Sequence, residues 1–241
     1  MNDFVQGAEW ALRGIEEFFR RPRLWRFVAI PMLLVLAIYA FLFHAVLSIW
    51  LPQLLAAMRE FFVDSWFEFL YRLTEILVKV GVYLSLTVLT ALFADNLFEI
   101  LGGFCFSRMV RDYETRILQC EIVKIPPRQE FANLAECGVF SAVTLMLYVF
   151  FFIAGFFLPV IAPLAMTLLI GYRYAVIYTS EAVFNSGRRL SDVAELYAGR
   201  RGLLYGFGTV AFLLFLVPLL PIFFIPGLVI GGTLMYHHRR D

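Results

Sequence analysis

Charged side chains are scarce in this sequence. Asp, Glu, Lys and Arg make up 16% of the 241 residues, whereas soluble domains carry about 25%. Hydrophobic residues reach 61%, and the mean hydropathy is +0.80. This composition excludes an ordinary water-soluble domain, and it predicts one all-α integral membrane domain over residues 1–241.

A surplus of basic charge and a framework of cysteines are also missing. The chain has 20 Lys and Arg residues and 19 Asp and Glu residues, which leaves a net charge of +1. We therefore expect no nucleic-acid partner. Cys105, Cys120 and Cys137 show neither metal-type pairing nor the dense, even pattern of a disulfide framework. We expect three reduced thiols and no metal site.

Motifs of soluble enzymes are absent as well. The sequence has no glycine-rich phosphate loop ending in lysine, no pair of histidines on one helix face and no nucleophile elbow. We therefore expect neither enzymatic activity nor a cofactor. For an intramembrane enzyme only the carboxylates Asp95 and Glu99 qualify, and the alternative that we favour is a solvated face where a helix leaves the membrane.

Long uncharged runs are what the sequence does contain. Between Arg26 and Arg59 there is no Asp, Glu, Lys or Arg, and this run exceeds the roughly 20 residues that cross a bilayer as a helix. We predict transmembrane helices over residues 27–50 and 73–94. The second continues into water as a helix to about residue 118, because no proline interrupts it.

The N-terminal segment predicts an amphipathic helix over residues 4–20. Its charged residues lie opposite an apolar stripe, so the helix is too polar to span a membrane and is expected to lie flat at the interface. The stripe comprises Phe4, Ala8, Ala11, Leu12, Ile15, Phe18 and Phe19.

Two later segments, 137–180 and 202–238, are largely uncharged and have prolines near their middle. Both patterns predict helical hairpins. In the first, Arg173 follows Pro163 by only about 15 Å of helix, so full crossing would leave its charge near the bilayer centre. In the second, the arm after Pro226 is about 18 Å long, which is less than the hydrocarbon thickness of roughly 30 Å.

These lengths predict that both hairpins are re-entrant and penetrate the membrane only half-way. Pro159 and Pro221 are then expected inside the hydrocarbon layer. Turns at that depth must be covered by protein or line a polar pathway, so we expect a homo-oligomer. The basic clusters of the chain all fall on one side of this topology, which predicts that both termini face the cytoplasm.

An arginine-rich segment precedes the first predicted span. Pro22, Arg23, Trp25 and Arg26 lie beside the start of that helix. Guanidinium groups near a helix N-terminus are donors suited to an oxyanion such as sulfate or phosphate. A positively charged topology anchor is the alternative, and the residues alone leave both interpretations open.

Two stretches resemble a known family. They are Pro-Arg-Leu-Trp-Arg-Phe-Val-Ala-Ile-Pro at residues 22–31 and Ile-Pro-Gly-Leu-Val-Ile-Gly-Gly-Thr-Leu at residues 225–234. Together with the long helix after the second span, they resemble the CysZ-type sulfate permeases of the etoposide-induced-protein membrane family. The order of segments resembles this family over nearly the whole chain.

The resemblance implies an oligomer with two spanning helices and two half-penetrating hairpins, which carries sulfate through the inner membrane for cysteine synthesis. It also implies a substrate site at Arg26, Arg23, Trp25 and Pro22. The family usually has a glycine where this chain has Arg23 and an arginine where it has Trp25, so Arg26 alone matches its arginine pair. Another departure is Gly103-Phe104-Cys105, which stands where the family has Ala-Pro-Phe.

Two functions of different classes follow. The first is a membrane permease or channel for sulfate or a related small oxyanion, working without ATP. The second is a non-transporting membrane assembly or lipid-organising protein, whose arginines anchor anionic headgroups. Both have the lipid bilayer as a partner.

Overall fold

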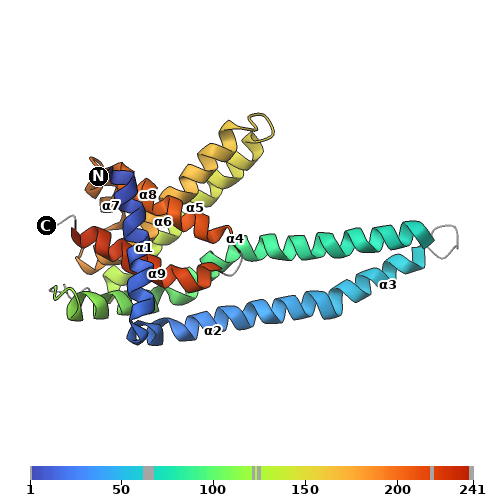
Figure 1. Cartoon of the computed structure of the whole chain (residues 1–241), viewed down its shortest axis with the longest axis horizontal. Helices are drawn as coiled ribbons and strands as arrows, with labels where there is room; N and C mark the ends of the chain where they lie inside the picture. The colour runs from blue at the N-terminus through green and yellow to red at the C-terminus, as the bar shows by residue number, and fades with distance from the viewer. Residues whose placement is uncertain (1, 62–67, 121–122, 124–125, 218–219, 239–241) are drawn as a thin grey trace.

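The computed structural model describes residues 2–61, 68–120, 123, 126–217 and 220–238. Within these ranges the regular structure is entirely helical, which confirms the predicted all-α class. Figure 1 shows two long helical hairpins that diverge from a common bundle. The elements are α1 (Asp3–Arg20), α2 (Pro22–Ala45), the π-helical turn η1 (Val46–Trp50), α3 (Leu51–Phe61), α4 (Glu68–Arg116), α5 (Pro127–Ala154), α6 (Ile161–Asn185), α7 (Leu190–Leu196), α8 (Arg201–Phe215) and α9 (Leu220–His238).

Helix α1, which corresponds to the amphipathic helix expected at residues 4–20, lies across α8 and α9 (Figure 1). Glycines allow the backbones to approach closely at these crossings. A Cβ atom added to Gly7 would overlap the carbonyl oxygen of Leu203, and one added to Gly14 would overlap the backbone of Gly231. The buried face of α1 consists of the small residues Gly7, Ala11 and Gly14 followed by Phe18, and it contacts protein.

Beyond this face, α1 is held at its N-terminal end by an ion pair. The Nη2 atom of Arg200 lies 2.7 Å from Oδ1 of Asp3. The hydrogen bond from Arg200 lowers the pKa of the Asp3 carboxyl. Phe4, Val5 and Leu12 stay exposed on the outer side of the helix. Its position relative to a membrane surface stays a prediction.

The long hairpin consists of α2, η1 and α3 on one side and α4 on the other (Figure 1). The helix that begins at Pro22 extends well beyond the span expected at residues 27–50. Pro52 explains the π-helical turn before it, because proline has no N–H and its ring clashes with the carbonyl group one turn earlier. At this turn the N–H of Leu51 bonds to the carbonyl oxygen of Val46, five residues back.

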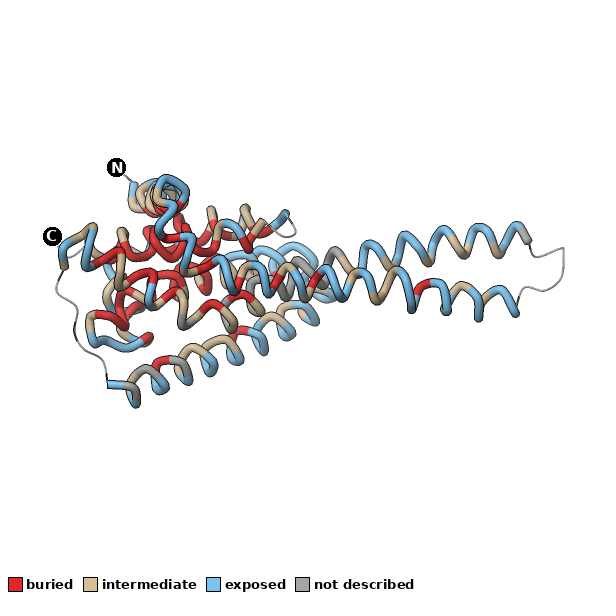
Figure 2. Tube along the Cα trace, turned by 90° about the horizontal axis from the view of Figure 1, so that it is seen from below, coloured by how far each residue is buried: buried red, intermediate tan, exposed pale blue. Residues whose placement is uncertain are grey.

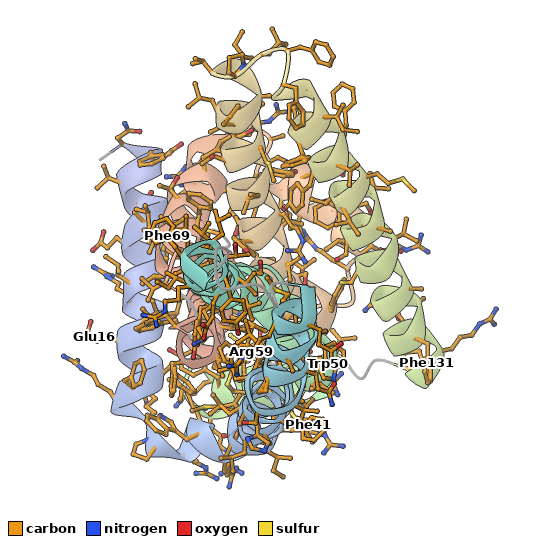
Figure 3. All side chains as sticks on the ribbon, turned by 90° about the vertical axis from the view of Figure 1, so that its right-hand side faces the viewer. Glu16, Phe41, Trp50, Arg59, Phe69 and Phe131 are labelled. Carbon is orange, nitrogen blue, oxygen red and sulfur yellow. The ribbon has the colours of Figure 1, made fainter. Side chains whose placement is uncertain are left out.

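The core lies where α1, α6, α8 and α9 meet the C-terminal end of α4, as the buried segments in Figure 2 show. Tyr178, Phe207 and Leu228 are fully buried there. The long hairpin is different, because many of its apolar side chains point outward. Phe41, Trp50 and Phe69, labelled in Figure 3, are about 70% exposed. A surface of this kind suits hydrocarbon rather than water.

Four of the described helices are long and apolar enough to cross a membrane. They are Pro22–Glu60, Phe131–Ala154, Ile161–Asn185 and Leu220–His238. The apolar helices and the chain's composition support a membrane protein. The expected span at 73–94 falls in α4, where part of the side chains lies outside the described residues, as do those of Asp95 and Glu99.

The structure changes both arguments from which half-depth hairpins were expected. Pro226 does not lie at the turn but well inside α9, whose 19 residues give an arm of about 28 Å. Pro221 lies in the first turn of α9, where proline is tolerated. Arg173 is buried in protein at 4% exposure, so its charge does not face lipid. The depth of the hairpins stays a prediction.

Candidate anion site at the start of α2

The corner between α1 and α2 fixes the direction of the second helix. Arg21 occupies the N-cap position of α2, and Pro22 is the first helical residue, where the absence of an N–H costs nothing. The Nε atom of Arg21 donates a 2.6 Å hydrogen bond to Oε2 of Glu17. The backbone N–H of Arg21 donates to the carbonyl oxygen of Phe18 at 3.2 Å.

The register of α2 separates its apolar and basic side chains. Leu24 and Val28 are buried in the core at 1% and 2% exposure. Arg23 and Arg26 lie on another side of the helix, where α2 packs against α4. Both guanidinium-bearing side chains are about half exposed. The helix thus presents two cations to the last turns of α4.

One carboxylate on α4 meets these arginines. Oδ2 of Asp112 lies 3.8 Å from Nε of Arg23, and Oδ1 lies 3.5 Å from Nη2 of Arg26. Oδ1 also contacts Nε of Arg116 at 2.8 Å, one helical turn further along α4. The Asp112 side chain is only 14% exposed. Three guanidinium groups therefore surround one carboxylate, and we call these four residues the Asp112 cluster.

The three contacts in the Asp112 cluster differ in kind. The contact with Arg116 has the length of a charge-assisted hydrogen bond, which is about 2.7–2.9 Å. The contacts with Arg23 and Arg26 are longer, so they are ion pairs without a hydrogen bond. Among the described residues no side-chain hydrogen bond uses the donors of Arg23 or Arg26. Those donors can bind an anion.

Trp25 points away from the Asp112 cluster. Its ring stacks on Phe18 with centroids 5.8 Å apart and an interplanar angle of 6°. Its Nε1 atom donates a 3.3 Å hydrogen bond to the carbonyl oxygen of Phe18. Trp25 also lines an apolar cavity of about 190 Å³, together with residues such as Phe19 and Phe223. Of the four predicted site residues, the structure thus brings only Arg23 and Arg26 to the carboxylate, while Pro22 shapes the corner.

Tyr113 lies beside the corner between α1 and α2, close to Arg21. Burial, with a further contribution from the Glu17 carboxylate, raises the pKa of Tyr113 to about 12. The guanidinium carbon of Arg21 lies 6.0 Å from the centre of the Tyr113 ring. The phenol is therefore neutral at physiological pH and adds no negative charge to the site.

A second polar cluster holds α4 from its other side. Oε1 of Glu114 lies 2.8 Å from Nε2 of His237, and Oε2 accepts a 2.8 Å hydrogen bond from Asn185. The same Asn185 accepts a 3.1 Å bond from Nε of Arg111. Glu114 is buried at 3% exposure. This cluster joins α4, α6 and α9, and it fixes the rotation of α4 that turns Asp112 toward α2.

The arrangement suits binding of an oxyanion rather than metal chemistry. Among the described residues, no group of three His, Cys, Asp or Glu side chains is placed to hold a metal ion. The local pattern around Pro22 pointed to the two α2 arginines. The sequence pattern singles out neither Asp112 nor Glu114 as a site residue. The four-residue spacing of Asp112 and Arg116 indicates only a helical ion pair.

Comparison with known proteins gives one family. The family model described as "Sulfate transporter CysZ/Etoposide-induced protein 2.4" matches residues 10–226. The matched region includes the start of α2 and all of α4. No curated protein matches the chain.

Proposed function

The chain belongs to the sulfate transporter CysZ/etoposide-induced protein 2.4 family, and we propose that it is a membrane permease or channel for sulfate or a related small oxyanion. The family is one of transporters rather than enzymes and suggests a sulfate-transporter-like membrane function. The choice of substrate and the site that binds it are our proposals.

The observation that carries this proposal is the excess of positive charge in the Asp112 cluster. Arg23, Arg26 and Arg116 bring three guanidinium groups to one carboxylate, so two positive charges are left without a counter-ion in the cluster. An oxyanion between Arg23 and Arg26 accepts hydrogen bonds from donors that are otherwise unused. Each bond to a charged partner contributes about 1.5–3 kcal/mol.

The wider arrangement that we propose has the protein in the inner membrane with both termini in the cytoplasm, as a homo-oligomer that supplies sulfate for sulfur assimilation. The outward-facing apolar side chains of the long hairpin support contact with lipid or with a second copy of the chain. Hairpins that penetrate half-way remain part of this proposal.

A second candidate function is a non-transporting membrane assembly that organises lipid. The half-exposed guanidinium groups of Arg23 and Arg26, at the entry of an apolar helix, favour it. Both functions use the same cations, but only a permease moves solute. A flux measurement therefore separates them.

The test is sulfate uptake by the purified full chain reconstituted in liposomes. We expect saturable flux for the parent and a loss of about tenfold to a hundredfold in sulfate affinity for Arg26→Ala, because one charged hydrogen-bond donor is gone. The matched control is Arg128→Ala, which removes an exposed arginine at the start of α5. Absence of saturable flux for the parent would overturn the proposal, and equal affinity of both variants would overturn the site.

A further inference from the structure

The Asp112 carboxylate lies beside the guanidinium groups of Arg23 and Arg26, whose donors a bound anion would use. We propose that its carboxylate is an internal competitor of the transported anion, which limits the affinity of the site and makes release possible. This inference rests on the proposed function, and it assigns Asp112 a role in the binding and release of the anion.

The two oxygen atoms of Asp112 divide the arginines between them. Oδ1 forms an ion pair with Nε of Arg116 at 2.8 Å, and this contact lies within α4 and does not depend on α2. The longer contacts to Arg23 and Arg26 join the two helices. An incoming oxyanion can therefore take the donors of Arg23 and Arg26 while Arg116 continues to hold the carboxylate. Asp112 stays close to the anion and repels it.

The backbone that carries Asp112 is fixed. Glu114, two residues further on, points to the opposite side of α4 and is held by His237 and Asn185. Rotation of α4 would break these buried contacts. Because the backbone is held here and Arg116 lies 2.8 Å from Oδ1 of Asp112, the carboxylate stays near Arg23 and Arg26 when an anion enters.

The net charge of the Asp112 cluster matches that of a dianion such as sulfate. Three guanidinium groups and one carboxylate leave two positive charges, which a dianion neutralises and a monoanion does not. The repulsion from Asp112 is twice as large for a dianion as for a monoanion at the same position. Removal of the carboxylate charge should therefore raise the affinity for a dianion by the square of the factor for a monoanion.

Release explains why a carboxylate belongs in such a site. Conduction requires binding that is strong enough for entry and weak enough for exit. Three arginines without a counter-charge would hold a dianion strongly and slow its departure. With Asp112 present, Arg23 and Arg26 keep a carboxylate beside them after the anion leaves, so part of their charge is still compensated.

The experiment compares sulfate with perchlorate, a monoanion of the same tetrahedral shape. Binding to the purified full chain in detergent is measured for the parent, Asp112→Asn, Asp112→Glu and Arg26→Gln. For Asp112→Asn we expect an increase in sulfate affinity of about tenfold and an increase in perchlorate affinity of about threefold. Maximal sulfate flux in liposomes should fall by severalfold in the same variant. Asp112→Glu keeps the charge and should stay within about threefold of the parent.

The outcomes separate this inference from the proposed function. If Asp112→Asn binds sulfate no more tightly than the parent while Arg26→Gln loses binding, Asp112 is only a clasp between α2 and α4, and the proposed function stands. If neither the parent nor Asp112→Asn binds sulfate, both proposals fail. Asp112→Ser removes the same charge with a smaller side chain. Failure of both neutral variants to fold, judged by size-exclusion elution and helical content, would also show a structural clasp and overturn the inference.

Discussion

Glu114 and His237 join the C-terminal ends of α4 and α9 through a contact of 2.8 Å between Oε1 and Nε2. The residues are 123 positions apart in the chain, and Glu114 is buried. The other oxygen of Glu114 accepts a hydrogen bond from Asn185 of α6. One carboxylate thus ties three helices together directly behind the Asp112 cluster.

We expect Glu114→Ala to destabilise the protein. The substitution leaves the buried polar groups of His237 and Asn185 without their partner, which costs about 1–3 kcal/mol in the free energy of unfolding. Thermal unfolding of the purified protein in detergent measures the effect. Glu16→Ala serves as a control, because Glu16 is exposed and its pair with Arg20 is worth at most about 1 kcal/mol. Equal melting temperatures for the two variants would contradict a structural role of Glu114.

Position 25 offers a test of how far the family pattern applies here. The resemblance to the family implies an arginine at this position, but Trp25 stacks on Phe18 and faces away from Asp112. We therefore expect Trp25→Arg to lower stability by about 1–3 kcal/mol through lost packing, without raising sulfate affinity. Trp25→Phe, which keeps an aromatic ring, should be milder and cost about 0.5–1.5 kcal/mol for the lost N–H bond. A tenfold gain in sulfate affinity for Trp25→Arg would instead place position 25 among the ligands.

Two glycines should respond to the same substitution with opposite signs. Gly7→Ala places a methyl group against the Leu203 carbonyl, so α1 must move away from α8, at a cost of about 1–3 kcal/mol. At Gly81 in α4 nothing lies within 4 Å of an added Cβ, and alanine should stabilise the helix by about 0.5–1 kcal/mol. Melting temperatures check both changes. A melting temperature of Gly7→Ala equal to or above that of the parent would show that α1 is not packed as described.

Local patterns in the sequence were sufficient for the helices and for one side of the site. Apolar runs and the stripe of α1 identify helical segments without any tertiary information, and the arginines near Pro22 stand out in the same way. The sequence of residues 22–26 alone does not show which side chains share a site. Trp25 and Arg26 are neighbours in the chain, but Trp25 packs on Phe18 and Arg26 faces Asp112. Their directions follow from the burial of Leu24 and Val28 in a core built by distant helices.

The parts that the sequence left open depend on contacts between distant segments. Asp112 reaches Arg26 only because α2 and α4 form a hairpin, and no local pattern marks that pair. The sequence pattern also places the second hairpin's turn wrongly, at Pro226. Proline is typical of turns, but Pro226 is buried inside α9. Packing of α9 against α1 and α6 compensates for the hydrogen bond that proline cannot make.

The crossing of α1 over α8 and α9 also has a consequence for the order in which the chain assembles. Asp3 binds Arg200, 197 residues later in the chain, so α1 is made well before α8 and α9, the helices on which it packs. During synthesis, α1 has nothing to dock on until most of the other helices exist. We predict that its exposed apolar residues and charged face hold it at the membrane surface in that interval. Docking of α1 onto α8 and α9 is then a late step of assembly, which follows the synthesis of both helices.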